Sequence, residues 1–269
     1  MGINLKKSLN FVFEDQDWIK KILIGGFFLL IVFLLNSINR LTELLPSISM
    51  FNGSSYTIER AFQIALSVFS TILSIAVIAI PVGYVAQSAH NLIKAESAIL
   101  PEWDSMYFEY FKKGLGIFFI NLAYLFLLFF IISIPAIIDK IIVLFFPSNL
   151  IITIINIFLI TVLVLPAIAG YILIIPFANI SYADDFDFWD AFNPEIIISE
   201  IFQNFSDYLL ILFISIILFA ILPAILLFLA CTCVGILAPP FIMFYMVLVI
   251  ANMYSQLYKQ VKYPDLSIK

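Results

Sequence analysis

Charged residues are confined to short segments of this chain, and their confinement constrains the fold more than any other feature. Five stretches, which together hold 170 of the 269 residues, contain no Lys, Arg, Asp or Glu: residues 22–39, 61–93, 114–138, 141–183 and 208–258. A charge at the centre of a bilayer costs roughly 2.5 to 3.5 kcal/mol, whereas water imposes no such exclusion. Hydrophobic residues make up 64% of the chain and charged residues only 12%. We therefore predict an all-α, polytopic integral membrane protein with a single membrane domain over residues 1–269.

The apolar stretches divide into six membrane spans. About 20 helical residues cross the hydrocarbon of a bilayer, at a rise of about 1.5 Å per residue. Pro147, Ser148 and Asn149 predict a break in the fourth stretch, and the fifth is interrupted between Cys231 and Pro240. The predicted spans cover residues 22–41, 64–86, 115–138, 150–177, 209–229 and 240–257.

The basic residues predict the orientation of these spans. Ten of the thirteen Lys and Arg residues fall on the side of the two termini, and only Arg40, Arg60 and Lys140 fall on the other side. Because Lys and Arg in short loops are retained on the cytoplasmic side, we expect a multi-pass protein of the cell membrane with both termini in the cytoplasm. A glycosylation sequon begins at Asn52 in a predicted outer loop, and its use stays open.

Tryptophan spacing indicates an internal repeat. Trp18, Trp103 and Trp189 are the only tryptophans, and each lies in an acidic, aromatic segment before an odd-numbered span. Each even-numbered span carries a Pro, then a Tyr, then an Asn seven or eight residues after the Tyr: Pro81, Tyr84 and Asn91; Pro166, Tyr171 and Asn179; Pro240, Tyr245 and Asn252. We predict three helical hairpins, residues 1–95, 96–183 and 184–262. The alternative is that such residues collect at any membrane interface.

Two of the cytoplasmic segments have the residue spacing of amphipathic helices. Residues 105–113 and 195–205 each place apolar side chains along one helical face, and Asn193 with Pro194 supplies a helix start for the second. We expect both helices to lie on the inner membrane surface, where they either anchor the hairpins or form a platform for lipid or a partner.

Three groups of residues resemble a known family. They are Asp15, Asp17, Trp18 and Lys21 at the start, the Leu-Pro-Glu-Trp-Asp run at 100–104, and Pro240, Phe241, Phe244, Tyr245, Ala251, Tyr254, Gln256 and Tyr258 near the end. With them the chain resembles the membrane proteins classified as domain of unknown function 4013, which are found in archaea and bacteria. The resemblance covers nearly the whole chain. It implies a six-helix fold and brings no known activity and no established catalytic residue.

Motifs for catalysis or cofactor binding are absent from the sequence. His90 is the only histidine, and Cys231 with Cys233 cannot complete a zinc site alone. We predict no catalytic residue, no metal, no cofactor and no nucleic-acid partner. The candidate binding residues lie at the inner interface and are Trp18, Trp103, Asp104, Trp189 and Asp190. The expected partners are membrane lipids and an unidentified membrane or cytoplasmic protein.

Three functions stay open at this point. We favour a non-enzymatic role as a scaffold, assembly helper or lipid-organising factor, because this role needs no buried charge. The first alternative is a passive or lipid-handling transporter for a neutral or amphipathic solute, since prolines interrupt several spans. The second is a metal-dependent lipid enzyme that uses inner-face acids such as Asp104, Asp184, Asp185, Asp187 and Asp190. A cavity walled by the spans of Pro81, Pro166 and Pro240 would favour the first alternative.

Overall fold

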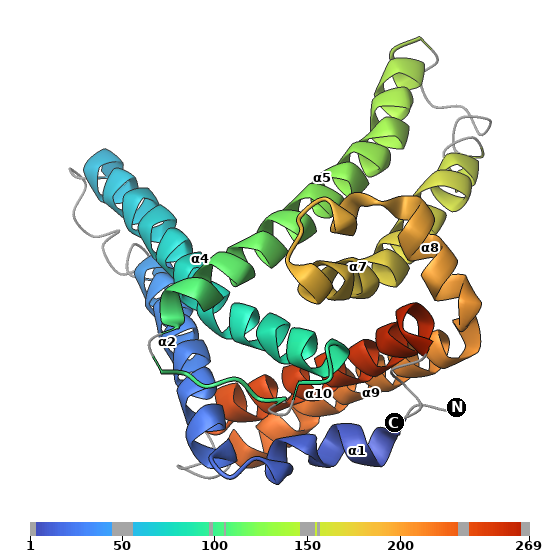
Figure 1. Ribbon diagram of the computed structural model, residues 1–269. Helices are drawn as coiled ribbons and strands as arrows, with labels where there is room; N and C mark the ends of the chain where they lie inside the picture. The colour runs from blue at the N-terminus through green and yellow to red at the C-terminus, as the bar shows by residue number, and fades with distance from the viewer. Residues whose placement is uncertain are drawn as a thin grey trace.

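Long helices account for most of the chain in a computed structural model, which describes residues 4–44, 56–96, 99–104, 106–145, 154, 157–230 and 237–264. The elements, in order, are α1 (Leu5–Asn10), the 3-10 helix η1 (Phe11–Glu14), α2 (Trp18–Leu44), α4 (Tyr56–Ile93), α5 (Tyr107–Phe145), the π-helical turn η2 (Ile160–Val164), α7 (Leu165–Asp185), the 3-10 helix η3 (Asp190–Phe192), α8 (Pro194–Gln203), α9 (Phe205–Ala230) and α10 (Pro239–Lys262) (Figure 1). The described residues contain no strand, and this agrees with the all-α prediction.

Six of these helices are long and apolar enough to cross a membrane, which confirms the predicted number of spans. Their apolar parts are Trp18–Ser37, Arg60–Ile93, Tyr107–Ile138, Ile157–Asp185, Phe205–Ile225 and Pro239–Lys262. Pro239 and Pro240 occupy the first positions of α10, where a missing N–H costs nothing. The predicted break at residues 147–149, the two cysteines and Asn52 lie outside the described residues.

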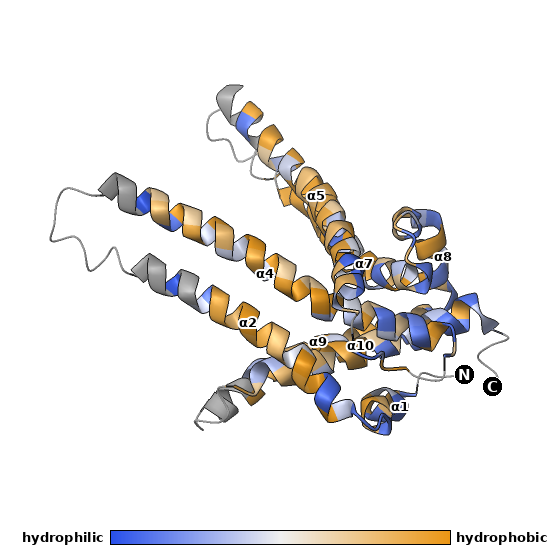
Figure 2. Ribbon diagram, turned by 60° about the vertical axis from the view of Figure 1, so that its left-hand side comes forward, coloured by the Kyte–Doolittle hydropathy of each residue, from blue (hydrophilic) through white to orange (hydrophobic). Residues whose placement is uncertain are grey.

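The six long helices alternate in direction, so that α2, α5 and α9 begin at the end of the molecule where α4, α7 and α10 finish. We call this the polar end. The short elements α1, η1, η3 and α8 also lie there, and hydrophilic residues gather there, whereas hydrophobic residues dominate the remaining helix lengths (Figure 2). Away from the polar end, α4 and α5 diverge (Figure 1).

The helices cross closely near the polar end, where two glycines allow α4 to contact α5. A Cβ atom at Gly83 would overlap the carbonyl of Tyr110, and one at Gly114 would overlap the carbonyl of Ala79. Small residues allow such close backbone approach between membrane helices, where apolar burial alone gives little drive for association. The interface between α4 and α5 is the most extensive helix contact among the described residues.

That interface joins helices from two different predicted hairpins. The consecutive pairs α2 with α4, α5 with α7, and α9 with α10 do contact each other, but α10 also packs against α2 and α4. The packing therefore does not separate into three hairpins. The structural equivalence of residues 1–95, 96–183 and 184–262 remains a prediction.

The two predicted amphipathic segments differ in structure. Residues 107–113 form the first two turns of α5 rather than a separate helix, because one helix continues without a break from this segment into the apolar span. In contrast, α8 is a separate helix, and the Asn193 side chain caps its start by accepting a hydrogen bond from the N–H of Ile196 at 3.4 Å. The location of these segments on the membrane surface remains a prediction.

Prolines leave the long helices continuous within the described residues. Pro81, Pro135, Pro176 and Pro223 each lie inside a helix that is not interrupted, and a kink at these positions remains a prediction. Pro166 follows the π-helical turn Ile160–Val164, a wider turn that accommodates the local loss of a backbone donor.

Candidate functional site

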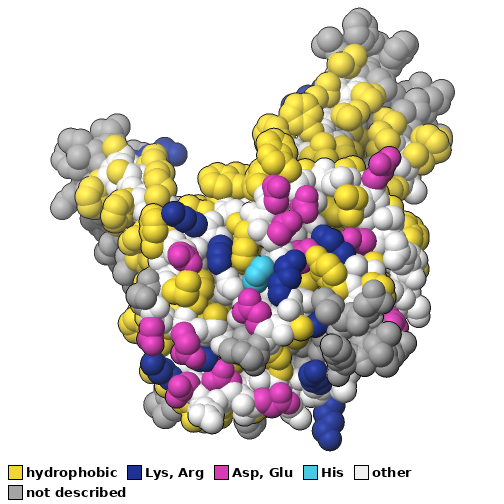
Figure 3. Space-filling model, in the orientation of Figure 1, with side chains coloured by type: hydrophobic (Ala, Val, Ile, Leu, Met, Phe, Trp, Pro, Cys, Tyr) yellow, Lys and Arg dark blue, Asp and Glu magenta, His cyan; other side chains and the backbone are white. Residues whose placement is uncertain are grey.

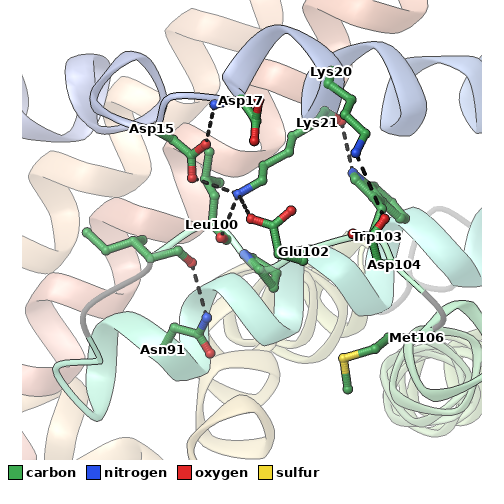
Figure 4. A network of polar contacts seen from close by, with 12 residues as sticks. Asp15, Asp17, Lys20, Lys21, Asn91, Leu100, Glu102, Trp103, Asp104 and Met106 are labelled. Atoms are coloured by element: carbon green, nitrogen blue, oxygen red, sulfur yellow. Dashed lines mark hydrogen bonds and ion pairs between the residues drawn. The ribbon is translucent and has the colours of Figure 1, made fainter.

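A buried lysine, Lys21, organises the first polar cluster of the polar end. Its side chain is 3% exposed, and its Nζ lies 2.8 Å from Asp15 Oδ2 and 2.6 Å from Glu102 Oε1. It also donates a hydrogen bond to the carbonyl oxygen of Leu100 at 3.2 Å (Figure 4). Two carboxylates and a carbonyl thus compensate the cost of removing this charge from water.

The Leu-Pro-Glu-Trp-Asp run packs beside this lysine as a structural segment. The Trp103 ring is buried and stacks on Tyr84, with 4.1 Å between ring centroids. Its Nε1 donates to the carbonyl oxygen of Lys21 at 3.1 Å, and the Tyr84 hydroxyl donates to the carbonyl oxygen of Pro101 at 2.8 Å. The Tyr110 hydroxyl donates to the carbonyl oxygen of Glu102. These bonds fix residues 100–104 to α2, α4 and α5.

The five candidate binding residues occupy different environments. Trp103 is buried, Trp18 is half-buried and packs edge-on against Phe13, and Trp189 is 75% exposed. Asp104 is exposed and lies 3.9 Å from Lys20 Nζ.

The structure brings Trp103 and Asp104 to the start of α2, and it places Trp189 and Asp190 beside α8. Burial, with the nearby charges of Asp185 and Asp187, raises the pKa of Asp190. The two tryptophans therefore lie in different surroundings. A binding role for these residues remains a prediction.

A second polar cluster surrounds Asp184, the last-but-one residue of α7. Its carboxylate is buried and lies 2.7 Å from Lys94 Nζ and 2.8 Å from Lys262 Nζ. The Tyr263 hydroxyl donates to it at 2.9 Å. Burial lowers the pKa of Lys94, but the hydrogen bonds to Asp184 and Tyr263 outweigh burial, so the net shift is upward. One carboxylate thus connects the polar-end termini of α4, α7 and α10.

Glu200 on α8 is an uncompensated acid beside this cluster. It is only 7% exposed, and its Oε2 has no hydrogen-bond partner in the described part of the chain. Burial raises its pKa to about 7, with further contributions from Asp184 and Asp190, while Lys262 opposes the shift.

Glu200 lies on the side of α8 that packs against the protein. Ile197, Glu200 and Ile201 are buried there, whereas the apolar side chains of Ile198 and Phe202 are exposed. The spacing of three and four residues between these buried positions was the signal that could have identified the acid.

Charged side chains of both signs gather on the polar end, and hydrophobic side chains cover the two arms that project from it (Figure 3). His90 is held within this region, because its Nδ1 lies 3.0 Å from the carbonyl oxygen of Ala183. Among the described residues, no group of three or more His, Cys, Asp or Glu side chains could hold a metal ion. The inner-face acids therefore do not converge on a metal site in this part of the chain.

An apolar cavity of about 520 Å³ lies next to the Asp184 cluster, between α4, α7, α9 and α10, with Ile117 of α5 also in its wall. The sequence pattern suggested a cavity between the spans of Pro81, Pro166 and Pro240 but did not identify the side chains that line it. The α7 wall extends from Tyr171 to Ala183, about 18 Å of helix at 1.5 Å per residue. Its lining is almost entirely apolar, and four residues bring polar atoms: Tyr171, Asn179, Ser215 and Tyr254.

An amide pair joins two helices at the level of this cavity. Asn121 of α5 and Asn179 of α7 exchange hydrogen bonds, at 3.3 Å and 3.4 Å between amide nitrogen and amide oxygen. Paired amides satisfy each other where no water is available, so they connect the helices without a buried charge.

A family model described as "Protein of unknown function (DUF4013)" matches residues 66–231 of the chain. The match covers more than half of the chain and confirms the family resemblance. Residues 100–104 lie within the matched part, whereas the motifs at 15–21 and 240–258 lie outside it. No curated protein and no solved structure matches the chain.

Proposed function

The chain belongs to the DUF4013 family of unknown function, and we propose from its geometry that it is a membrane protein that binds the acyl chain of a lipid. The observation that carries the proposal is the apolar cavity of about 520 Å³. Its volume falls within the roughly 300–1,000 Å³ of small-molecule sites. Its length along α7 suits a chain rather than a compact solute.

The composition of the cavity wall supports an apolar occupant. The lining residues come mostly from membrane-spanning helices, where acyl chains are the most abundant apolar molecules. Small side chains widen the cavity near the polar end, and they are Ala86, Ala89, Ala183 and Ala251. The cavity is walled by the spans that contain Pro81, Pro166 and Pro240, as the lipid-handling alternative requires.

The polar contacts around the cavity favour a fixed shape. Asp184 holds the ends of α4, α7 and α10 together, and these three helices form most of the wall. A preformed cavity lowers the entropy cost of binding, since fewer groups must be ordered when the ligand enters.

We also infer that the polar end faces the cytoplasm and that the protein lies in the cell membrane. Most Lys residues belong to the segments at this end, and Lys and Arg in short loops are retained on the cytoplasmic side. A protease-protection assay with a C-terminal tag tests the orientation. Digestion of the tag by protease added outside intact cells would contradict this orientation.

The proposed function is tested by filling the cavity. The substitution Ala251→Phe introduces a ring into the cavity wall on α10, and Ala169→Phe makes the same change on an exposed position of α7 that does not line the cavity. We expect native mass spectrometry of the purified wild-type protein to show bound lipid, and Ala251→Phe to reduce it at least severalfold. Ala169→Phe should retain the wild-type amount.

Circular dichroism and size-exclusion profiles establish that both variants are folded. Equal lipid retention by a folded Ala251→Phe variant, or wild-type protein without bound lipid, would contradict the proposal.

A further inference from the structure

Lys113 lies on α5 on the polar-end side of the cavity, next to the wall but not part of its lining. Its position is one helical turn before Ile117, which contributes to the cavity wall. Its Nζ donates to the Gln87 side-chain oxygen and lies 4.2 Å from the centre of the Phe186 ring. Phe186 follows the last cavity residue of α7 by three positions, whereas Gln87 lies on another face of α4 than the cavity residues Ala86 and Ala89. The ammonium group is therefore at the meeting point of α4, α5 and α7.

The charge on Lys113 has no paired carboxylate in the described residues. Its side chain is half-buried, and its contacts are an amide oxygen and an aromatic ring. Glu109 and Glu96 contribute negative potential at the ammonium group, but neither forms an ion pair with it. In contrast, Lys21 and Lys94 each contact a carboxylate within 3 Å. A half-buried ammonium without a counter-ion is stabilised by an anion that reaches it.

The position of Lys113 along α5 matches the depth of a lipid headgroup. It is the last charged residue before the uncharged stretch 114–138, which enters the hydrocarbon. A lipid with one chain in the cavity would place its phosphate near the level where that stretch begins. The ammonium group thus combines the charge and the depth that an anionic headgroup requires.

We propose that the cavity takes one acyl chain of an anionic membrane phospholipid, whose phosphate contacts the ammonium group of Lys113. This inference rests on the proposed function, since it names the class of lipid that the same cavity binds. It follows that the protein selects lipids by net headgroup charge. Loss of Lys113 removes the selection while the apolar wall still holds a chain.

The test uses full-length protein reconstituted in vesicles of equal parts phosphatidylglycerol and phosphatidylcholine, then purified and analysed for retained lipid. Charge-assisted hydrogen bonds are among the stronger hydrogen bonds in proteins, and we expect roughly tenfold enrichment of phosphatidylglycerol by the wild-type protein. Lys113→Gln should lower the enrichment to about onefold, with the total retained lipid unchanged.

Two further variants separate the headgroup contact from other effects. Lys112→Gln removes the same charge from the adjacent, exposed position, and it should keep the wild-type enrichment. Lys113→Arg keeps the charge and should also keep the enrichment, which shows that the site tolerates substitution.

The outcomes distinguish this inference from the proposed function. Retained lipid without enrichment in the wild-type protein, or equal loss of enrichment in Lys112→Gln, would overturn the inference and leave the proposed function standing. Loss of all lipid from both Lys113 variants would assign Lys113 a structural role and also overturn it. Wild-type protein that retains no lipid would overturn both proposals.

Discussion

The polar end and the distal halves of the long helices both carry large aromatic side chains, yet these side chains are mainly buried at the polar end and mainly exposed in the distal halves. We define the distal halves as residues 60–73 of α4, residues 122–138 of α5, and residues 157–170, which include η2 and the start of α7. At the polar end, Tyr84, Tyr110 and Tyr258 are fully buried. In the distal halves, Phe126 and Phe158 are exposed, like most of their neighbours. Apolar side chains alone do not pack these helices, because lipid tails solvate Phe about as well as another helix does.

Specific polar contacts account for the difference. Tyrosine hydroxyls of several helices donate to backbone carbonyls of other segments near the polar end: Tyr84 to Pro101, Tyr110 to Glu102, Tyr208 to Leu173 and Tyr245 to Leu9. Each bond connects two segments that are separated in the sequence, and water competes poorly for it in a buried site. In this protein, directional bonds and small residues determine where helices meet.

The largest effect is expected at Asp184. Asp184→Asn leaves Lys94 and Lys262 without their buried counter-ion and should lower the free energy of unfolding by about 3 kcal/mol, after allowance for the partial exposure of both lysines. Thermal and denaturant unfolding in detergent micelles measures the change. Asp185→Asn, at the exposed adjacent position, is the control and should change stability by less than about 0.5 kcal/mol. Equal effects of the two variants would remove the basis for the comparison.

A pair of glycines compares the polar end with a distal half directly. Gly83→Ala places a methyl group against the carbonyl of Tyr110 and should destabilise the protein by about 2 kcal/mol. Gly170→Ala has nothing within 4 Å and should be neutral or stabilise the helix by up to about 1 kcal/mol. The same unfolding assay measures both. A Gly83→Ala variant as stable as the wild-type protein would show that α4 and α5 do not approach each other this closely at Gly83.

Glu200 should make the folding stability of the protein depend on pH. Its pKa is about 7 in the folded protein, against an ordinary value of 4.5, so the unfolded chain releases this proton at lower pH than the folded chain. Stability should therefore fall as pH rises from about 4.5 to 7, and Glu200→Gln should remove this part of the loss.

The expected gain from Glu200→Gln is about 1 to 2 kcal/mol at pH 8 and close to zero at pH 4. Unfolding measured at both pH values checks the prediction. A gain that is the same at pH 4 and pH 8 would show that the carboxyl group does not titrate in this range.

The smallest effect is expected at the exposed ion pair of the polar end. Asp104 and Lys20 lie 3.9 Å apart with both side chains mostly in solvent, so Asp104→Asn should change stability by less than about 1 kcal/mol. High salt should weaken any effect further. A loss comparable to that of Asp184→Asn would mean that exposure does not separate the two clusters.

The sequence was sufficient for the number of spans because the exclusion of charge from hydrocarbon is a local property. It also contained the positions of Lys21 and Asp184, each of which is the first charge beside an uncharged stretch. Their partners were not predictable, since Glu102 and Lys262 are remote in sequence and only packing brings them close.

The burial of the tryptophans and the lining of the cavity could not be predicted from the sequence either. Regular spacing predicted related positions for Trp103 and Trp189, but one ring is buried and the other exposed, because burial depends on which helices pack over it. The side chains that line the cavity could not be predicted for the same reason. Its wall combines side chains of five helices, and no single helix carries a signal for it.

The central claim is that an acyl chain occupies the cavity near the polar end rather than only the exposed distal halves. Photo-crosslinking with a phospholipid that carries a diazirine on its acyl chain, followed by peptide mapping, tests this claim directly. We predict labelling at residues 82–89 of α4 and 171–183 of α7 that is competed by unlabelled lipid and reduced by Ala251→Phe. Labelling confined to exposed positions such as Phe126 and Phe158, with none in the cavity wall, would contradict the account.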